Sequence, residues 1–288
     1  MNKPVIIIRP AGRMANQMLQ LMFAVELSRK LGDAPVFGYN LPEWGIKGPK
    51  PPGIISLPDE MLLISKHRFN FNNLITLLKN KIVNGVVLEG WGMRLEHFGP
   101  RQIYQKLFQS NQKTLHLSEN ELLINIRAED ILSGWHPEYF PMAFSYFEKV
   151  ISTTGLSPVF MGQIGSDLYS LALKNKFKDA RFLPQISPMV DFQTIRNAHH
   201  IALSVSSFSW LAAWLSETAK SIHMPFAGLF QPEITGTNLI PLSDPRYRYY
   251  HVPFPLPTER KTINLVEWAE ANHPTYEVFL KNSSAHRG

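Results

Sequence analysis

Residues 5–12 read Val-Ile-Ile-Ile-Arg-Pro-Ala-Gly, and this stretch decides the fold. The β-branched run 5–8 predicts a strand that is buried on both faces of a parallel sheet. Residues 10–12 interrupt it, and residues 15–31 then carry apolar side chains at helical spacing, with Gly32 behind them as a stop. Strand, glycine turn and helix are the first unit of an α/β domain.

The rest of the chain continues this pattern less regularly, and a second α/β series begins near residue 120. We expect strands at 36–38, 82–89, 122–127, 158–161 and 201–205, and helices at 139–152, 167–176, 189–197, 208–220 and 265–271. Gly-Pro-Lys-Pro-Pro-Gly at 48–53 predicts a loop. The predicted partition is a domain at 1–117, a second at 118–235, and a tail at 236–288 that packs back on both. The basic and aromatic segments 246–251 and 260–261 are interpreted as solvated parts of that tail.

Composition narrows the function classes. The chain has 288 residues, is 44% hydrophobic and 18% charged, and carries 29 Lys and Arg against 23 Asp and Glu, a net charge of +6. These values are typical of a globular protein, and the small, scattered basic excess disfavours nucleic-acid binding. The absence of cysteine excludes a disulfide framework and a thiolate metal site.

Hydropathy predicts a soluble chain without an export signal or a transmembrane segment. The apolar run 5–8 is shorter than a secretory signal core, and residues 201–216 fall short of the roughly 20 needed to cross a bilayer. We therefore expect a cytoplasmic protein, either free or peripheral to a membrane.

The first candidate site is Gly12-Arg13-Met14-Ala15-Asn16-Gln17, where the predicted strand passes into the helix. A glycine allows the tight turn, and the free N–H groups of a helix amino end bind anions. By itself this is the turn that any βα unit needs. The patterns G-x-G-x-x-G and G-x-x-x-x-G-K-[ST] are absent, which disfavours a nicotinamide site and a P-loop.

The second candidate site is the end of the strand 122–127, where Asn125 and Arg127 are followed by Asp130. A guanidinium held at a sheet edge is suited to a bidentate contact with phosphate, and Asp130 would orient it. The alternative, weighed equally, is an ion pair between Arg127 and Asp130 that closes a turn.

The third candidate is Asp191, in the first turn of a predicted helix. Its carboxylate either stabilises the helix amino end or accepts hydrogen bonds from the N1–H and N2–H₂ edge of a guanine.

Ser206 and Ser207 form the fourth candidate site, between a predicted strand and helix. They either cap the helix or join its free N–H groups in binding a phosphate. Neither D-x-D nor metal-ligand spacing of the ten histidines occurs, so the sequence predicts no metal site.

Together these places resemble the alpha-1,2-fucosyltransferases, within the wider group of GDP-fucose-dependent transferases. Residues 12–20 are similar to the family's G-G/R-x-G-N-Q-M-F-Q, and residues 125–130 match H-x-R-R-x-D in part. Asp191-Phe192 and residues 206–215 are similar to D-F followed by N-S-S-F-S-W-W-A-A-W-L, the most specific match; residues 88–98 resemble G-Y-x-Q-S-x-x-Y-F loosely. The resemblance extends from residue 3 to about 225.

The resemblance implies a GT-B fold, with two Rossmann-like domains facing a central cleft. Its donor is GDP-fucose, with no cofactor or metal. Carried over by position, the donor site comprises Gly12, Asn16, Gln17, Asn125, Arg127, Asp130, Asp191, Ser206 and Ser207. Arg127 would hold the β-phosphate, the two serines the diphosphate, and Asp191 the guanine. Asn125 replaces the family's histidine and Ala128 its second arginine, so another GDP-sugar is an alternative donor.

The implied reaction is an inverting transfer of the sugar to a hydroxyl of a glycan acceptor. Arg127, hydroxyls and a helix amino end would stabilise the departing diphosphate. His136 and Glu138 are the candidate catalytic bases, and Trp91 and Trp135 are candidates for stacking against the acceptor sugar.

Two other interpretations remain. A catalytically silent nucleotide-sugar-binding protein would keep the fold and lose motif positions, as Asn125 and Ala128 allow. A Rossmann oxidoreductase is disfavoured by the missing glycine pattern.

Overall fold

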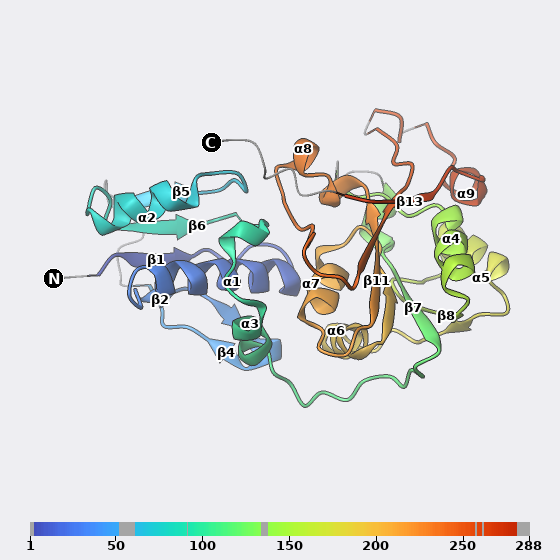
Figure 1. Cartoon of the computed structure of the whole chain (residues 1–288), viewed down its shortest axis with the longest axis horizontal. Coiled ribbons are helices and arrows are strands. Elements are labelled where there is room, and N and C mark those ends of the chain that lie inside the picture. Colours follow the sequence, from blue (N-terminus) through green and yellow to red (C-terminus); the bar gives the residue numbers. More distant parts are fainter. Residues whose placement is uncertain are drawn as a thin grey trace. The chain divides into compact units, whose positions relative to one another are not determined.

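The structure is a computed structural model that describes residues 3–51, 61–90, 92–133, 138–256, 258–260 and 262–280. The chain forms two compact units. The first comprises Met1–Ser110 with Gly236–Leu239, and the second comprises Asn111–Thr235 with Ile240–Gly288. Each unit is built on its own sheet, and the two are described in turn (Figure 1).

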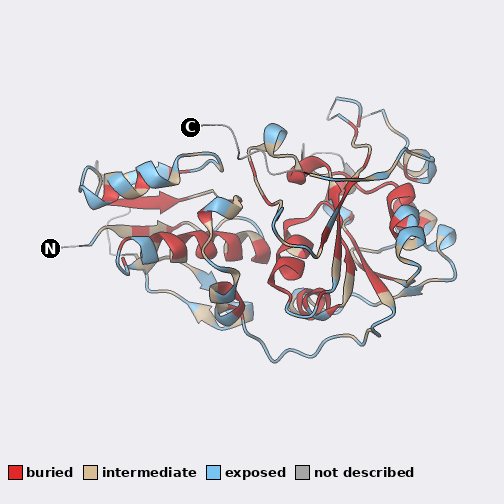
Figure 2. Cartoon of the chain, in the orientation of Figure 1, coloured by how far each residue is buried: buried red, intermediate tan, exposed pale blue. Residues whose placement is uncertain are grey.

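The first unit contains a four-stranded parallel sheet in the order β2-β1-β6-β5. Its strands are β1 (Val5–Ile8), β2 (Val36–Phe37), β5 (Met61–Ile64) and β6 (Gly85–Leu88). The other elements are α1 (Met14–Lys30), β3 (Asn40–Leu41), η1 (Pro42–Trp44), β4 (Ile46–Lys47), α2 (Phe71–Lys79), η2 (Leu95–His97) and α3 (Arg101–Leu107). Helix α1 packs against β1 and is buried along most of its length (Figure 2).

A short return segment, Gly236–Leu239, belongs to the first unit because it pairs with the residues around η2. Arg94 Nη1 donates to the Gly236 carbonyl at 2.6 Å, and the Leu95 amide donates to the Asn238 carbonyl at 2.8 Å. The chain then enters the second unit again.

The second unit contains a seven-stranded sheet in the order β13-β12-β11-β10-β7-β8-β9. The strands are β7 (Glu121–Ile126), β8 (Ser157–Gly162), β9 (Arg181–Phe182), β10 (His200–Ala202), β11 (Ser221–Phe226), β12 (Tyr247–His251) and β13 (Tyr276–Val278). All neighbouring pairs are parallel except β12 with β13. Counted along the chain, the six parallel strands have the order 3-2-1-4-5-6, which is the doubly wound arrangement of dinucleotide-binding folds.

Helices cover both faces of this sheet. Figure 1 shows α4, α5 and α9 on one side of it and α6 and α7 on the other. The elements outside the sheet are η3 (Glu129–Ser133), α4 (Phe144–Thr154), α5 (Leu168–Lys176), α6 (Pro188–Asn197), α7 (Ser207–Leu215), η4 (Gly228–Phe230), α8 (Pro232–Thr235) and α9 (Leu265–Glu270). Within the described segments, no helix combines the length and apolarity that a bilayer-spanning segment requires.

The predicted α/β class is confirmed, since both units carry parallel strands joined through helices. The elements missed by the sequence analysis include β5, α2, α3 and the three strands β11 to β13. Helix α7 is shorter than predicted and ends at Leu215. Its end is fixed by Ser216, whose Oγ accepts hydrogen bonds from the amides of Thr218 and Ala219 at 3.2 and 2.9 Å.

The interpretation of residues 246–251 as a solvated tail is wrong. Residues 247–251 form β12, which extends the sheet beside β11, and Tyr247, Tyr249 and Tyr250 are buried. Burial of these large rings against the sheet is favourable, and the free energy gained exceeds the cost of desolvating the polar groups of this segment. Arg260 is also buried, with its guanidinium over the rings of Phe140 and Phe254.

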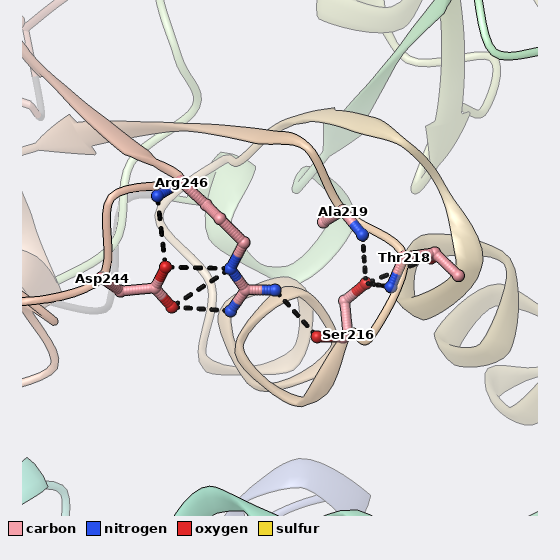
Figure 3. A network of polar contacts seen from close by, with 5 residues as sticks. All are labelled: Ser216, Thr218, Ala219, Asp244 and Arg246. Atoms are coloured by element: carbon pink, nitrogen blue, oxygen red, sulfur yellow. Dashed lines mark hydrogen bonds and ion pairs between the residues drawn. The ribbon is translucent and has the colours of Figure 1, made fainter.

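Arg246 ties the start of β12 to the end of α7 (Figure 3). Its Nε and Nη2 donate to the two carboxylate oxygens of Asp244 at 2.9 and 2.7 Å, and its Nη1 donates to the Ser216 carbonyl at 2.8 Å. Both charged side chains are about 15% exposed (15% and 14%). The guanidinium therefore satisfies a carbonyl at the helix carboxyl end, where a positive charge is favourable.

Arg246→Gln is expected to lower the free energy of unfolding by about 2 kcal/mol, because it removes the guanidinium charge and its hydrogen bonds from a largely buried carboxylate. Urea denaturation followed by circular dichroism measures the change. Arg181→Gln is the control, since the ion pair of Arg181 with Glu121 is 42% exposed on the arginine side and should be worth less than about 1 kcal/mol. Equal losses of unfolding free energy in the two variants would contradict the stabilising role assigned to Arg246.

A second prediction concerns pH. Burial lowers the pKa of His223 from its ordinary value of 6.5 to about 4. Its ring contacts the Tyr250 hydroxyl at 2.9 Å and the Ser221 hydroxyl at 3.2 Å. Between these pH values the unfolded chain binds a proton at His223 that the folded chain does not. The contribution of this histidine to the free energy of unfolding is therefore complete above pH 6.5 and is lost as the pH decreases toward 4.

His223→Gln is expected to flatten that dependence by up to about 1.4 kcal/mol per pH unit. Thermal melts between pH 4.5 and 7.5 test it, with the exposed residue His116 changed to glutamine as the control. An unchanged slope in His223→Gln would rule out this origin of acid sensitivity.

Candidate functional site

The candidate site lies in the second unit, where the strand order reverses between β7 and β10. From β7 the chain runs outward to β8 and β9, then resumes on the other side of β7 with β10. Ala202 is the register partner of Ile124, so the two strands end side by side. Ser204 Oγ donates to the Asn125 carbonyl and ties the ends together. Open α/β sheets bind ligands outside the carboxyl ends of their strands at such a reversal.

Arg127 is the first residue after β7. Its Nη2 donates to Asp130 Oδ2 at 2.9 Å, and its guanidinium carbon lies 5.6 Å from the centre of the Tyr139 ring. The arginine side chain is 20% exposed, and its buried Nε has no hydrogen-bond partner among the described residues. The Arg127–Asp130 ion pair that the sequence analysis offered as an alternative is present, and the Nε–H of the guanidinium takes no part in it.

Gln163, at the end of β8, braces the turn that carries Arg127. Its Oε1 accepts from the Ala128 amide at 3.0 Å, and its Nε2 donates to Glu129 Oε2 at 2.9 Å. Glu129 has φ +53°, in the left-handed region that residues with a Cβ seldom adopt. Such a conformation costs on the order of 1–3 kcal/mol and persists only where neighbours hold it. Gln163 is such a neighbour, so the turn is fixed.

Ser206 and Ser207 stand at the start of α7. Ser206 occupies the N-cap position and makes no side-chain capping bond, although it is only 4% exposed. Ser207 is hydrogen-bonded through its side chain to Tyr139, whose pKa is raised to about 12, mainly by burial. Tyr139 thus contacts both Arg127 and Ser207, and the structure brings these two predicted residues together.

Asp191 lies on α6, which packs against α7 through Phe192 and Phe208, with ring centres 5.4 Å apart. The aspartate is 6% exposed, and its Oδ1 has no hydrogen-bond partner among the described residues. Burial raises the pKa of its carboxyl group, and a hydrogen bond from the Ile186 backbone opposes that shift. A buried acceptor without a donor is uncommon in folded proteins.

Asn125 and Glu138 are the remaining described candidates of this unit. Asn125 is 5% exposed, and its Nδ2 lies so near Gly162 that a Cβ on that glycine would be 2.9 Å away. The Glu138 carbonyl accepts from the Leu229 amide at 3.0 Å, which fixes its backbone. Burial raises the pKa of the Glu138 carboxyl group. Trp91, Trp135 and His136 lie outside the described residues.

Gly12, Asn16 and Gln17 lie together in the first unit, at the turn between β1 and α1. Gly12 has φ +71°, and a Cβ there would lie 2.5 Å from Asn16 Nδ2. Gln17 Nε2 donates to the Gly12 carbonyl at 2.9 Å. These three residues therefore form one local cluster within the first unit.

Sequence reasoning missed Tyr139, Gln163 and Ser204. Gln163 follows the predicted strand 158–161 and Ser204 lies near the end of the predicted strand 201–205, so both are polar residues at strand ends, which is the signal that identified Arg127. Tyr139 carries no such signal, because its role depends on contacts with residues distant in the sequence.

A cavity of about 280 Å³ lies elsewhere in this unit, beside the first residues of β10 and β11. Its lining includes His200, Ser221, His223 and Tyr250, which are hydrogen-bonded in series at 2.8, 3.2 and 2.9 Å. Because these groups satisfy one another, the cavity offers less to a ligand than the turn at Arg127. Among the described residues, no group of three or more His, Asp or Glu side chains is arranged to hold a metal ion.

No family model and no curated protein matches the chain. Among solved structures, it is similar to a mutant of FUT1 from Arabidopsis thaliana in complex with GDP, at 9% identity and a TM-score of 0.42, covering 74% of this chain and 69% of that one. It is also similar to TibC, an iron-containing dodecameric glycosyltransferase from enterotoxigenic E. coli, at 9% identity and a TM-score of 0.39, covering 77% of this chain and 58% of TibC.

Gly12→Ala is expected to destabilise the protein more than Gly32→Ala. Both glycines have φ near +70° (71° and 69°), so a Cβ brings the same backbone strain of about 1 kcal/mol at each. Only at Gly12 does the new carbon meet a side chain, since nothing lies within 4 Å at Gly32. Thermal denaturation of the two variants isolates the contact with Asn16. Equal melting temperatures would show that Asn16 moves freely and that the cluster is not rigid.

Proposed function

We propose that this chain is a glycosyltransferase that uses a GDP-sugar, GDP-fucose in the first instance, and transfers the sugar to a hydroxyl group of a glycan. The observation that carries the proposal is that Arg127 and Ser207 both contact Tyr139. These contacts lie where the strand order of the doubly wound sheet reverses. Donor binding is assigned to the domain of residues 118–235 and the acceptor side to residues 1–117.

The chemistry of a departing diphosphate matches this site. Cleavage of the sugar–phosphate bond leaves negative charge on the diphosphate and positive charge on the sugar ring. The uncommitted Nε–H of Arg127, the hydroxyl groups of Ser206 and Ser207, and the amino end of α7 are donors for that negative charge. In this proposal these groups stabilise the leaving group in place of a metal ion.

Recognition of guanine is assigned to Asp191. Its Oδ1 lacks a donor, and the N1–H and N2–H₂ groups of a guanine would supply two. Those donors would also favour the ionised carboxylate and offset the burial that raises its pKa. Asn125 and Asp130 complete the donor side, Asp130 by orienting Arg127.

Attack by an acceptor hydroxyl on the face opposite the diphosphate inverts the anomeric carbon in one displacement. Glu138 and His136 are the proposed bases, and burial, which raises the pKa of Glu138, makes its carboxylate a better proton acceptor. Trp91 and Trp135 are proposed to stack on the acceptor, and Gly12, Asn16 and Gln17 to contribute from the first unit.

A second candidate is a nucleotide-sugar-binding protein without catalysis. The observation in its favour is Ala128, which is fully buried with its amide bound to Gln163, at a position where the family has a second arginine. Compared with the fucosyltransferase motif, this site would therefore place one cation fewer beside a bound diphosphate. Binding of GDP-fucose without release of GDP would identify this form.

Arg127→Gln is expected to reduce sugar transfer by at least about 100-fold, because it removes the charge that stabilises the leaving group. The assay is release of GDP from GDP-fucose with a panel of oligosaccharide acceptors. The melting temperature without ligand should change little, since the Arg127–Asp130 pair is half exposed on the aspartate side (46%).

Arg127→Lys separates charge from geometry, because lysine keeps the charge and loses the fork of donors. Arg181→Gln is the control for removing a paired arginine elsewhere in the same unit. Thermal stabilisation by GDP, which follows from mass action, reports binding independently of turnover. Full transfer by Arg127→Gln would refute the proposed leaving-group role.

A further inference from the structure

A second polar pair stands at the carboxyl ends of the central strands of the first unit. Ile8 of β1 and Leu88 of β6 are register partners. The next residues, Arg9 and Glu89, therefore leave the sheet side by side, and Arg9 Nη1 donates to Glu89 Oε1. Their side chains are 42% and 36% exposed, so both are accessible at the edge where open α/β sheets bind ligands.

The backbone beneath this pair is held by one buried side chain. Gln20 of α1 is 0% exposed. Its Oε1 accepts from the Ala11 amide at 3.1 Å, and its Nε2 lies 3.1 to 3.4 Å from the carbonyl oxygens of Arg9, Glu89 and Gly90. An ordinary surface ion pair needs no such support. The glutamine fixes both strand ends, and with them the positions from which Arg9 and Glu89 project.

The chemistry of the pair selects its ligand. The contact between the two side chains occupies Nη1 of Arg9 and Oε1 of Glu89, and no other hydrogen bond is formed by either side chain in the described part of the chain. The guanidinium offers further N–H donors, and Oε2 of the carboxylate is an acceptor. An anion would be repelled by the carboxylate and a cation by the guanidinium. Adjacent hydroxyl groups of a sugar both donate and accept, and they match the pair.

We propose that Arg9 and Glu89 bind neighbouring hydroxyl groups of a neutral sugar. The identification of this sugar as the acceptor of a transfer reaction rests on the proposed function, whereas the pairing of hydroxyl groups with Arg9 and Glu89 does not. The two residues position the ligand and select its hydroxyl pattern.

The test measures binding of the full-length protein to an immobilised panel of neutral oligosaccharides ending in galactose, glucose, mannose or N-acetylglucosamine, with acidic counterparts that carry a carboxylate. Wild-type protein should bind at least one neutral member. Arg9→Gln and Glu89→Gln should each weaken that binding by about ten- to a hundredfold, as expected for a lost hydrogen bond to a charged group.

The controls are Arg181→Gln and Glu148→Gln, which remove members of ion pairs of similar exposure in the second unit (42% and 45%). Both should bind the panel as the wild-type protein does. No binding to any neutral member, equal binding by Glu89→Gln, or a preference for the acidic sugars would overturn the proposal.

Two further measurements separate this proposal from others. The double variant Arg9→Glu with Glu89→Arg keeps an ion pair but exchanges the positions of donor and acceptor. It should fold and lose sugar binding. Sugar binding at the wild-type level would show that the ion pair has only a structural role. Stabilisation by GDP should be unchanged in every variant. If GDP has no effect on the wild-type protein while sugar binding depends on Glu89, the proposed function fails and this assignment stands.

Discussion

The constraint on which the second unit depends is the reversal of strand order between β7 and β10. Two parallel strands that are far apart in the sequence end at the same point, and Ser204 closes the gap with its hydrogen bond to the Asn125 carbonyl. The turn that carries Arg127 and the helix that begins at Ser207 both start from this junction. Their proximity is therefore a property of the topology before it is a property of any side chain.

The groups around this junction are fixed in advance of any ligand. Glu129 is held in a left-handed conformation by Gln163, and Tyr139 lies between Arg127 and Ser207. Donors that are already oriented need no reorganisation when charge develops near them, and this is the main advantage of a protein site over water. The strained backbone of Glu129 belongs to the same fixed turn, because it persists only where neighbouring groups hold it.

The features of the fold and the site that depend on a local sequence pattern can be predicted from the sequence. The β-branched run at 5–8 predicts the first strand, and polar residues directly after strands identify Arg127 and the serines at the start of α7. Contacts made only in the folded chain leave no such pattern. Tyr139 is an ordinary aromatic residue in the sequence, and the segment 246–251 has the composition of a solvated tail, although it forms an inner strand of the sheet. Burial of its tyrosines depends on β11, which no local rule places beside it.

The return of the chain through Gly236–Leu239 has a consequence for synthesis on the ribosome. The sheet of the first unit is complete by residue 88, whereas the second sheet receives β12 and β13 only after the chain has passed back through its neighbour. Until Tyr247–His251 emerges, β11 is a bare edge able to pair with another nascent polypeptide. The second unit thus completes its assembly late, and truncation or premature termination before this strand would favour aggregation over a smaller, functional protein.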